Sequence, residues 1–375
     1  RQLRKKLKKY NKVKIKHNSN VYKIKNYNDH VKVFFNNTKF NTLHEVKSKY
    51  VVGCDGANSI TRKQMNTKMN NLGFTQKWAV IDLILKKNKK NLPDRTIQYS
   101  NPKQPATYCR NVGKRRRWEF AIKKQQSEKK IMSNTYIWNF LKPWLKKNEA
   151  YLERKTIYTF KSAISRQWVK GRIFIAGDAA HLMPPFMGQG MCAGIRDVSN
   201  LAWKIVKCLK NKHDERLLKT YHSERNTNVK EYVETTMRMG EFVNAAESIE
   251  ITKNISSGSD GTKSMQSIKP MLGVGLGSNK DVNRGKIFPQ LKLKNGKILD
   301  DKFSKSLILI LASELRNKKK LSKLPSINEN EAIGLTTLLK SYKAKALIVR
   351  PDRFILQSCK TVKGFNKFIK YFNKF

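Results

Sequence analysis

The sequence predicts an α/β protein with more than one domain. Residues 50–54 and 172–176 are short apolar runs, each followed by a turn that contains Gly and Asp and then by a helical pattern. Buried strands that lead through a turn into a helix are typical of open α/β sheets. The chain has 375 residues, and at about 150 residues per domain this length predicts two or three domains.

The chain is strongly basic, with 79 lysines and arginines against 27 aspartates and glutamates and a formal net charge of +52. Basic side chains neutralise phosphates, so such a charge is compatible with nucleic-acid binding. The excess is spread along nearly the whole chain, and it is mostly lysine accompanied by many asparagines, which indicates compositional drift on solvated surfaces. Between Ile173 and Trp203 the single lysine or arginine is Arg196. We therefore expect no specific nucleic-acid partner, and this spared segment is the better candidate for chemistry.

Neither a membrane nor a metal is expected as a partner. The longest strongly apolar run, Leu307–Ala312, is far shorter than the about 20 residues that span a bilayer, and no signal-peptide pattern opens the chain. Five cysteines are scattered without a C-x-x-C pair, and the histidines lack metal-ligand spacing. These features predict a cytoplasmic protein in a reducing compartment without a metal site. They leave the oligomeric state open.

Composition and periodicity divide the chain into five segments. Residues 1–71 and 166–255 are each expected to combine strands with helices, the second segment including long helices, and residues 72–165 to form a separate sheet domain. Residues 256–285 are rich in Gly and Ser and predict a linker or long loop. Residues 286–375 are expected to form a small α/β unit.

Local patterns predict the main elements within these segments. Alternating apolar and polar residues predict strands at 13–16, 21–24 and 31–34, and continuous apolar runs predict strands buried on both faces at 50–54 and 172–176. A helix to about residue 209 is expected to bury the face formed by Ile195, Val198, Leu201, Ala202, Ile205 and Leu209. A second long helix is expected at 214–247. The last ninety residues predict a strand at 307–311, a hairpin at 346–356, and a final helix with Thr361 as its N-cap.

The segment from Gly177 to Met191, GDAAHLMPPFMGQGM, carries the strongest signal. The strand before it places Asp178 at a carboxyl end, where open α/β sheets bind ligands, and a carboxylate there can accept hydrogen bonds from ribose or ribityl hydroxyls. Gly188 and Gly190 allow a flat ring to approach the backbone closely. The following helix points its N-terminus at that position and favours negative charge. An ordinary strand–turn–helix junction is the alternative.

A second motif, Asp55-Gly56-x-x-Ser59-x-x-Arg62, follows the other apolar strand. Asp55 and Ser59 stand where side chains cap a helix, so capping and cofactor contact are equally good interpretations of this motif alone. Arg62, one turn later, is either a cofactor contact or a solvated charge.

Together the motifs resemble the class A FAD-dependent aromatic hydroxylases, which are built like para-hydroxybenzoate hydroxylase, and within them the 3-(3-hydroxyphenyl)propionate/3-hydroxycinnamate hydroxylases. The resemblance extends over nearly the whole chain. It is carried by the segments YVVGCDGANS (50–59), LPDRTIQY (92–99), RRRWEF (115–120), AGDAAHLMPPFMGQGMCAGIR (176–196), LAWK (201–204), IFPQ (287–290) and RPDRF (350–354).

The resemblance implies a fold and a site. The fold is a glutathione-reductase-like Rossmann variant that binds FAD and NAD(P)H, with a β-sheet substrate domain and a C-terminal thioredoxin-like domain that here lacks C-x-x-C. Asp178 would bind the ribityl or ribose region of FAD, and the backbone around Gly190 would bind the flavin pyrimidine edge. The residues implied in cofactor binding are Asp55, Gly56, Arg62, Ile175, Ala176, Gly177, Asp178, Ala179, Ala180, His181, Pro184, Gly188, Gln189, Gly190, Met191 and Cys192. No catalytic residue is assigned.

The implied reaction is the hydroxylation of a phenolic acid to a catechol, with FAD as cofactor and with NADH (or NADPH) and O2 as co-substrates. The family's G-x-G-x-x-G strand–helix unit is absent from the sequence, and Gly273–Ser278 has the wrong spacing and reads as a loop. We therefore expect an N-terminally truncated FAD-binding domain. The alternatives are another FAD-dependent phenol or polyketide hydroxylase, an inactive truncated copy, or, in a different class, a basic nucleic-acid-binding protein.

Three weaker candidates remain open. The aromatic residues Trp78, Tyr99, Tyr108 and Trp118 could line a pocket, although aromatic residues on strands are more often core. Arg115–Arg117 could hold a substrate carboxylate, although a solvated face is the better interpretation. His181 is expected to be a buried, hydrogen-bonded histidine rather than a proton carrier.

Overall fold

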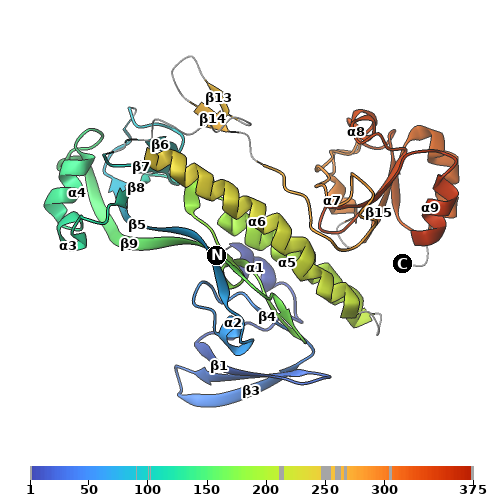
Figure 1. Ribbon diagram of the computed structural model, residues 1–375, viewed down its shortest axis with the longest axis horizontal. Helices are drawn as coiled ribbons and strands as arrows, with labels where there is room; N and C mark the ends of the chain where they lie inside the picture. Colours follow the sequence, from blue (N-terminus) through green and yellow to red (C-terminus); the bar gives the residue numbers. More distant parts are fainter. Residues whose placement is uncertain are drawn as a thin grey trace. The chain divides into compact units, whose positions relative to one another are not determined.

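The computed structural model describes residues 2–89, 91–99, 101, 103–210, 215–245, 255–257, 263–265, 268–303 and 306–372. The chain separates into two compact units (Figure 1). The first comprises residues 1–69 and 165–180, and the second comprises residues 70–164 and 181–375. Each unit is therefore assembled from pieces that are distant in the sequence.

An antiparallel sheet follows the short helix α1 (Gln2–Leu7) in the first unit. Its strand order is β1 (Ser19–Asn26), β2 (Val31–Asn37) and β3 (Thr42–Ser48), which confirms the strands predicted at 21–24 and 31–34. The strand predicted at 13–16 is wrong. Val13 and Ile15 are 43% and 40% exposed, so their alternation with lysines buries no face that would favour a strand.

A parallel strand pair forms the second sheet of this unit. The order is β10 (Val169–Lys170), β11 (Ile173–Ile175) and β4 (Val51–Gly53), and β11 pairs in parallel with β4 from Ile173–Val51 to Ile175–Gly53. Strand β11 is buried throughout, as predicted. Burial on both faces is wrong for β4, because Val52 is 37% exposed.

The second unit contains a larger sheet with two helices beside it (Figure 1). Its strand order is β12 (His181–Leu182), β9 (Ala150–Ser165), β5 (Met69–Leu85), β8 (Arg115–Ile122), β7 (Ala106–Arg110) and β6 (Ile97–Tyr99). Helices α3 (Glu128–Ile131) and α4 (Asn134–Leu141) precede the single turn η1 (Lys147–Glu149). Ile137 and Leu141 of α4 pack into one core with Trp118 and Phe120 of the sheet.

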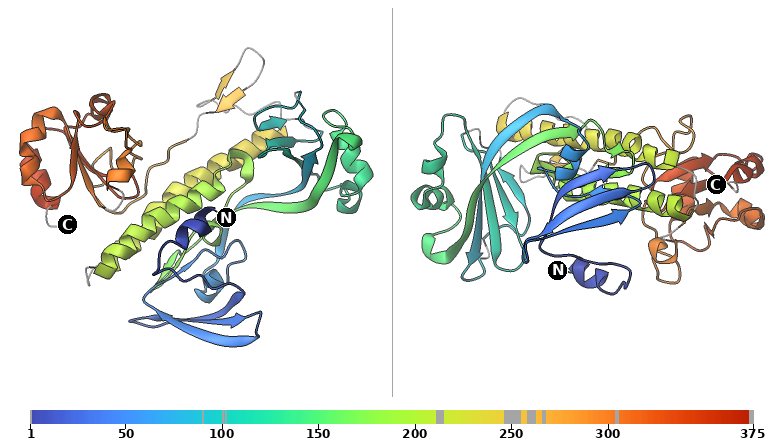
Figure 2. Two further views of the ribbon diagram at one scale, coloured as in Figure 1. Left: turned by 180° about the vertical axis from the view of Figure 1, so that it is seen from behind. Right: turned by 90° about the horizontal axis from the view of Figure 1, so that it is seen from below.

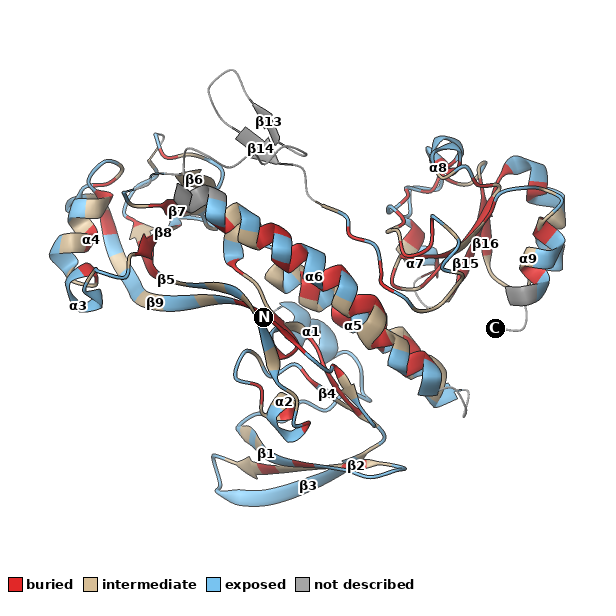
Figure 3. Ribbon diagram, viewed as in Figure 1, coloured by how far each residue is buried: buried red, intermediate tan, exposed pale blue. Residues whose placement is uncertain are grey.

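Two long helices, α5 (Gly190–Lys210) and α6 (Glu215–Ala245), confirm the predicted helices. The face expected to be buried on α5 is confirmed only at Leu201, which is 1% exposed. Ile195, Val198 and Leu209 are 54%, 38% and 45% exposed. Figure 3 shows buried and exposed positions alternating along both helices. The buried residues of α5 are Ala193, Asp197, Asn200, Leu201 and Lys204, and the polar members can be buried because they pair with charged side chains elsewhere in the unit.

The C-terminal residues of the second unit form a sheet between two layers of helices and turns (Figure 2). The strand order is β16 (Ser326–Asn328), β15 (Ile308–Leu311), β17 (Ala346–Val349) and β18 (Ile355–Cys359), with β15 and β16 parallel and the other pairs antiparallel. The remaining elements are α7 (Leu299–Phe303), η4 (Ser313–Leu321), α8 (Leu335–Ser341) and α9 (Phe365–Phe372). Separate apolar clusters fill the two faces of the sheet.

Most local predictions for this region are confirmed. The strand at 307–311, the hairpin and the final helix are present. Thr361 is not the N-cap of α9, because the helix begins at Phe365; its hydroxyl accepts the Gly364 N–H at 3.1 Å in the turn before the helix. The predicted linker falls partly outside the described residues. Its described part includes a pair of short strands, β13 (Ile255–Ser257) and β14 (Lys263–Met265), and the Gly273–Ser278 segment is a loop as predicted. Across the described ranges, no helix is long and apolar enough to cross a bilayer.

Candidate functional site

Two of the predicted motifs meet in the first unit, at the carboxyl ends of the parallel strands β4 and β11. The Ala176 N–H donates to the Gly53 carbonyl at 3.0 Å. Asp55 follows β4, and Asp178 lies in the single turn η2 (Gly177–Ala179) after β11. Helix α2 (Ile60–Gln64) approaches so closely that a Cβ atom on Gly53 would lie 2.4 Å from Thr61. Carboxyl ends of neighbouring parallel strands are where open α/β sheets bind ligands.

Asp55 uses both of its carboxylate oxygens to cap α2. The Ser59 hydroxyl donates to Oδ1 at 2.6 Å, and the Thr61 N–H donates to Oδ2 at 2.8 Å. Burial alone would raise the pKa of Asp55, but these hydrogen bonds outweigh it and hold the pKa below the ordinary value. Ser59 completes the cap by accepting the Arg62 N–H at 2.9 Å. The capping interpretation of this motif therefore describes what its side chains do.

Arg62 joins the two motifs directly. Its guanidinium donates to the Ala179 carbonyl at 2.8 Å and to the Ala57 carbonyl at 2.7 Å. This side chain therefore holds the turn after β11 against the turn after β4. Neither predicted alternative, a solvated charge or a cofactor contact, included this role. Its guanidinium is occupied by backbone acceptors of the protein itself.

Asp178 and Asp55 are both exposed, but only Asp55 has its two carboxylate oxygens engaged by hydrogen bonds to Ser59 and Thr61. In the part of the chain that the structure describes, the Asp178 carboxylate forms no hydrogen bond or ion pair. Gly177 beside it adopts φ +61° and forms the turn that carries Asp178. An exposed carboxylate at a strand end can accept hydrogen bonds from the hydroxyls of a ligand. Of the residues predicted in this unit, Asp178 is the side chain that remains available for that purpose.

His181, in the second unit, lies in a buried chain of charged groups. Its Nε2 is 2.7 Å from Asp197 Oδ2, and the Arg225 Nε donates to Asp197 Oδ1 at 2.9 Å. Arg225 also donates to Asn228 and to the Ala193 carbonyl. The prediction of a buried, hydrogen-bonded histidine is confirmed. Asp197 and Arg225 were not predicted. The available signal was that they are oppositely charged residues on the two long helices, α5 and α6.

The loop between His181 and α5 contains the other predicted residues. Pro184 precedes the single turn η3 (Pro185–Met187), which ends at Gly188 with φ +61°, and Gln189 accepts hydrogen bonds from Arg196 at 3.3 Å. Helix α5 then begins at Gly190, where a Cβ atom would meet nothing nearer than 3.9 Å. Met191 is 76% exposed and Cys192 half-buried. Packing within the described chain would therefore allow a larger residue at position 190. The close approach of a ligand to the backbone is a sufficient reason for glycine at this position.

Several aromatic residues gather beside this loop. The rings of Phe74 and Trp78 meet the Phe186 ring edge-on, with centroids 5.8 Å and 5.5 Å away. A Cβ atom on Gly240 of α6 would lie 2.5 Å from Phe186, so α6 packs directly on this ring. Trp78, Tyr108 and Trp118 are themselves fully buried, which supports the core interpretation of the predicted aromatic pocket. Phe74 and Phe186 were not among the predicted residues.

Arg115–Arg117 fit neither interpretation offered by the sequence. Arg115 forms an ion pair with Glu153 at 2.7 Å, and Arg117 pairs with Asp82 at 2.6 Å. Arg116 is buried and donates to backbone carbonyls. Their charges are compensated within the sheet, so they are neither simply solvated nor free for a substrate carboxylate.

These residues fit a flavin dinucleotide in part. Within the first unit, the exposed Asp178 carboxylate suits ribityl or ribose hydroxyls. Within the second unit, taken by itself, the open backbone at Gly190 suits a flat ring, and the N-terminus of α5 favours negative charge beside it. The two strand–turn–helix motifs thus define the class of protein as a dinucleotide-binding α/β protein.

Comparison with known proteins identifies the family. Residues 1–236 match the family model described as FAD binding domain, and the chain belongs to this family, whose cofactor is FAD. The chain is 37% identical over 196 residues to a probable NADH-specific resorcinol 4-hydroxylase of Rhodococcus jostii (strain RHA1), a match that covers 52% of this chain and 36% of the relative. It is 31% identical over 199 residues to a 3-(3-hydroxy-phenyl)propionate/3-hydroxycinnamic acid hydroxylase of Mycolicibacterium smegmatis (strain ATCC 700084 / mc(2)155), covering 53% of this chain and 35% of the relative. The matches thus span about a third of each relative's length.

Solved structures support the fold. The flavin-dependent monooxygenase PieE, in complex with FAD and substrate, aligns with a TM-score of 0.74 at 14% identity, over 95% of this chain and 75% of that one. Aklavinone-11 hydroxylase with FAD and aklavinone aligns with a TM-score of 0.72 at 15% identity, over 94% of this chain and 73% of that one. At such low identity the likeness establishes a shared architecture.

Proposed function

We propose that this chain acts in the FAD-dependent hydroxylation of a phenolic acid, of the 3-(3-hydroxyphenyl)propionate or 3-hydroxycinnamate type, to a catechol with NADH and O2. The observation that carries the proposal is the exposed Asp178 carboxylate at the end of the buried strand β11, locked in place by Arg62. The names of the two relatives support the aromatic substrate and NADH. FAD, when bound, supplies the redox chemistry, and the protein supplies binding, orientation and electrostatics.

The predicted residues take three roles in this proposal. Asp178 accepts hydrogen bonds from the ribityl or ribose hydroxyls, with Ile175–Ala180 as its backbone support. Residues Pro184 and Gly188–Cys192 supply the backbone and helix end for the flavin ring. Asp55, Gly56, Arg62 and His181 position these groups, since their own side chains are engaged in the protein or, for Gly56, form a turn at φ +78°.

The finer domain assignments are part of the same proposal. We assign residues 1–71 and 166–255 to the FAD-binding domain, 72–165 to the substrate domain, 256–285 to a linker and 286–375 to a thioredoxin-like domain. The sheet order β16-β15-β17-β18, with one parallel and two antiparallel pairs, supports the last assignment. We place the protein in the cytoplasm.

Binding of FAD to the purified chain tests the assignment of Asp178. Replacing Asp178 by Asn removes a charged acceptor, and because hydrogen bonds to charged groups contribute about 1.5–3 kcal/mol, we expect FAD to bind roughly tenfold more weakly or worse. Quenching of flavin fluorescence on titration measures this. Asp29→Asn is the matched control, since Asp29 is in the same unit and its side chain is 77% exposed. Equal effects of the two variants would contradict the role of Asp178.

The reaction needs its own assay. NADH oxidation is followed with FAD present, with and without 3-(3-hydroxyphenyl)propionate, and the product is analysed for a catechol. Stimulated oxidation with catechol formation is the expected result, and flavin binding without any stimulation would exclude this substrate class.

A further inference from the structure

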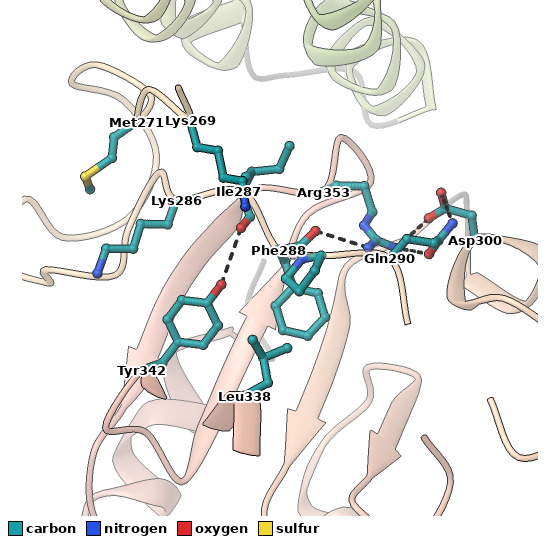
Figure 4. A pocket seen from close by; sticks show the side chains of 11 residues that line it. Lys269, Met271, Lys286, Ile287, Phe288, Gln290, Asp300, Leu338, Tyr342 and Arg353 are labelled. Carbon is teal, nitrogen blue, oxygen red and sulfur yellow. Dashed lines mark hydrogen bonds and ion pairs between the residues drawn. The ribbon is translucent and has the colours of Figure 1, made fainter. Parts of the chain in front are cut away.

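A pocket of about 710 Å³ lies in the second unit, on the C-terminal sheet and away from both predicted motifs in the sequence (Figure 4). Its size falls within the roughly 300–1,000 Å³ of small-molecule sites. It is lined by Lys269, Met271, Lys286, Ile287, Phe288, Pro289, Gln290, Asp300, Leu338, Tyr342 and Arg353. None of these residues has a place in the proposed flavin chemistry.

The floor of the pocket is apolar and aromatic. Leu338 and Tyr342 stand one turn apart at the C-terminal end of α8, on the same helix face. Tyr342 stacks on Phe288 with ring centroids 6.4 Å apart and an interplanar angle of 25°. Both α8 side chains are half-buried against the apolar cluster of this domain, and Met271 opposite is 40% exposed. Such a surface favours a flat, apolar body.

The charged groups of the pocket do not cancel. Arg353 is neutralised by Asp300 at 2.9 Å, and Gln290 donates to the same carboxylate at 2.7 Å. The Lys286 ammonium donates to Asn283 Oδ1 at 3.0 Å and lies 5.9 Å from the centre of the Tyr342 ring. Among the described residues, no ion pair with a carboxylate is recorded for Lys269 or Lys286. Three cations thus face one carboxylate, and two of the cations keep an uncompensated charge.

Tyr342 adds no opposing charge. Its hydroxyl donates to the Ile287 carbonyl at 3.4 Å, and burial raises the pKa of the phenol above its ordinary value. The phenol therefore stays neutral at physiological pH, so the pocket combines an aromatic floor with a net positive rim.

We propose that this pocket binds an aromatic carboxylate, with the ring system on Phe288, Leu338 and Tyr342 and the carboxylate between the ammonium groups of Lys269 and Lys286. The proposal is independent of the flavin site and holds whether or not the chain hydroxylates a phenol. Charge-assisted hydrogen bonds to the carboxylate and burial of the ring both contribute to binding.

Two-dimensional NMR of the full 375-residue chain with 13C-methyl-labelled methionine tests the proposal, with 2-naphthoate as the probe. The chain has ten methionines, and the Met271 signal is assigned by its loss in Met271→Leu. We expect 2-naphthoate to shift the Met271 signal saturably and to leave those of Met187 and Met191 unchanged. The uncharged 2-naphthamide, of nearly the same shape, should bind about tenfold more weakly because it lacks the charge.

Variants locate the site. The double variant Lys269→Gln/Lys286→Gln should weaken 2-naphthoate binding about tenfold or more without changing the weak binding of 2-naphthamide. The matched control is Lys292→Gln/Lys294→Gln, two exposed lysines of the same domain, which should bind as the unmodified chain does. Leu338→Trp should fill the pocket and abolish binding of both probes.

Three results would overturn the proposal: no saturable shift of Met271, equal affinity for the acid and the amide, or equal effects of the two lysine double variants. Because the readout needs neither FAD nor NADH, failure of the hydroxylase assay leaves this measurement unaffected. Thermal unfolding of each variant establishes that it is folded before its binding is compared.

Discussion

Three aspartates in and near the two motifs show how neighbouring groups decide the role of one residue type. Asp55 gives both oxygens to the N-terminus of α2, Asp178 is exposed at a strand end, and Asp197 lies fully buried between His181 and Arg225. The motifs left capping and cofactor contact open for Asp55 and favoured a ligand contact for Asp178. The structure leaves Asp178 available, makes Asp55 a capping residue, and gives Asp197 the role of pairing with two buried side chains.

Removing the Asp197 carboxylate should destabilise the protein strongly. In Asp197→Ala the Arg225 guanidinium, which is fully buried, loses its carboxylate partner, and breaking a buried ion pair costs about 3–5 kcal/mol. Urea unfolding followed by circular dichroism measures the difference in free energy. Asp94→Asn is the control, because Asp94 is 90% exposed in its pair with Arg110, and exposed pairs contribute only about 0–1 kcal/mol. A loss of under about 1 kcal/mol in Asp197→Ala would contradict this account.

At the scale of elements, patterns within a short stretch of sequence predicted well. The strand at 173–175, the cap of α2, the hairpin of β17 and β18 and the final helix follow from apolar runs and turn residues that lie next to one another. The inward face of α5 could not be predicted in this way, because its polar residues are buried with partners that lie far away in the sequence. Asp197 pairs with Arg225 28 residues away, and Asn200 donates to Asp352, 152 residues away. Periodicity scores each residue by its own polarity and contains no information about such partners.

The orientation of α5 can be tested with a charge at two residues that periodicity placed on one buried face. Leu201 is 1% exposed and Ile195 is 54% exposed. We expect Leu201→Glu to cost several kcal/mol, since it buries a carboxylate without a partner. Ile195→Glu should change stability by no more than about 0.5 kcal/mol, as exposed positions usually do. Chemical denaturation of both variants checks this. Comparable losses would mean that Ile195 is buried together with Leu201, as periodicity had suggested.

At the scale of the whole molecule, a buried cluster of two cations and two carboxylates connects distant parts of the second unit. Glu224 of α6 accepts hydrogen bonds from Arg350 at 2.8 Å and from Lys204 of α5 at 2.7 Å, and Arg350 also pairs with Asp352. The cluster connects both long helices to the turn between β17 and β18. Burial lowers the pKa of Lys204 to about 8 despite the neighbouring Glu224, so this lysine is charged at neutral pH. Burial of each charged group in this cluster therefore depends on the presence of its partners. The cluster consists of Lys204, Glu224, Arg350 and Asp352.

Glu224 should make stability depend on acid. Burial alone would raise its pKa, but Arg350 and Lys204 outweigh burial and hold the pKa well below the ordinary 4.5. A depressed carboxyl pKa contributes stability that is fully present above the unfolded value and is lost as the pH falls from there toward the folded value. We expect Glu224→Gln to cost about 3–5 kcal/mol at pH 7, because Arg350 and Lys204 lose a buried counter-charge. Below pH 4.5 this difference from the unmodified chain should shrink progressively.

Denaturant unfolding at a series of pH values from 7 to 3 measures that difference. Comparing the two proteins at each pH isolates Glu224, because the self-repulsion of a chain with a net charge of +52 acts on both alike. Glu45→Gln is the matched control, since Glu45 is 51% exposed in its ion pair with Lys32 and should change stability by less than about 1 kcal/mol. A penalty for Glu224→Gln that stays constant down to pH 3 would show that shape, rather than charge, makes this residue necessary. A penalty that declines with acid would establish the ionised Glu224 as the group that holds the long helices to the C-terminal sheet.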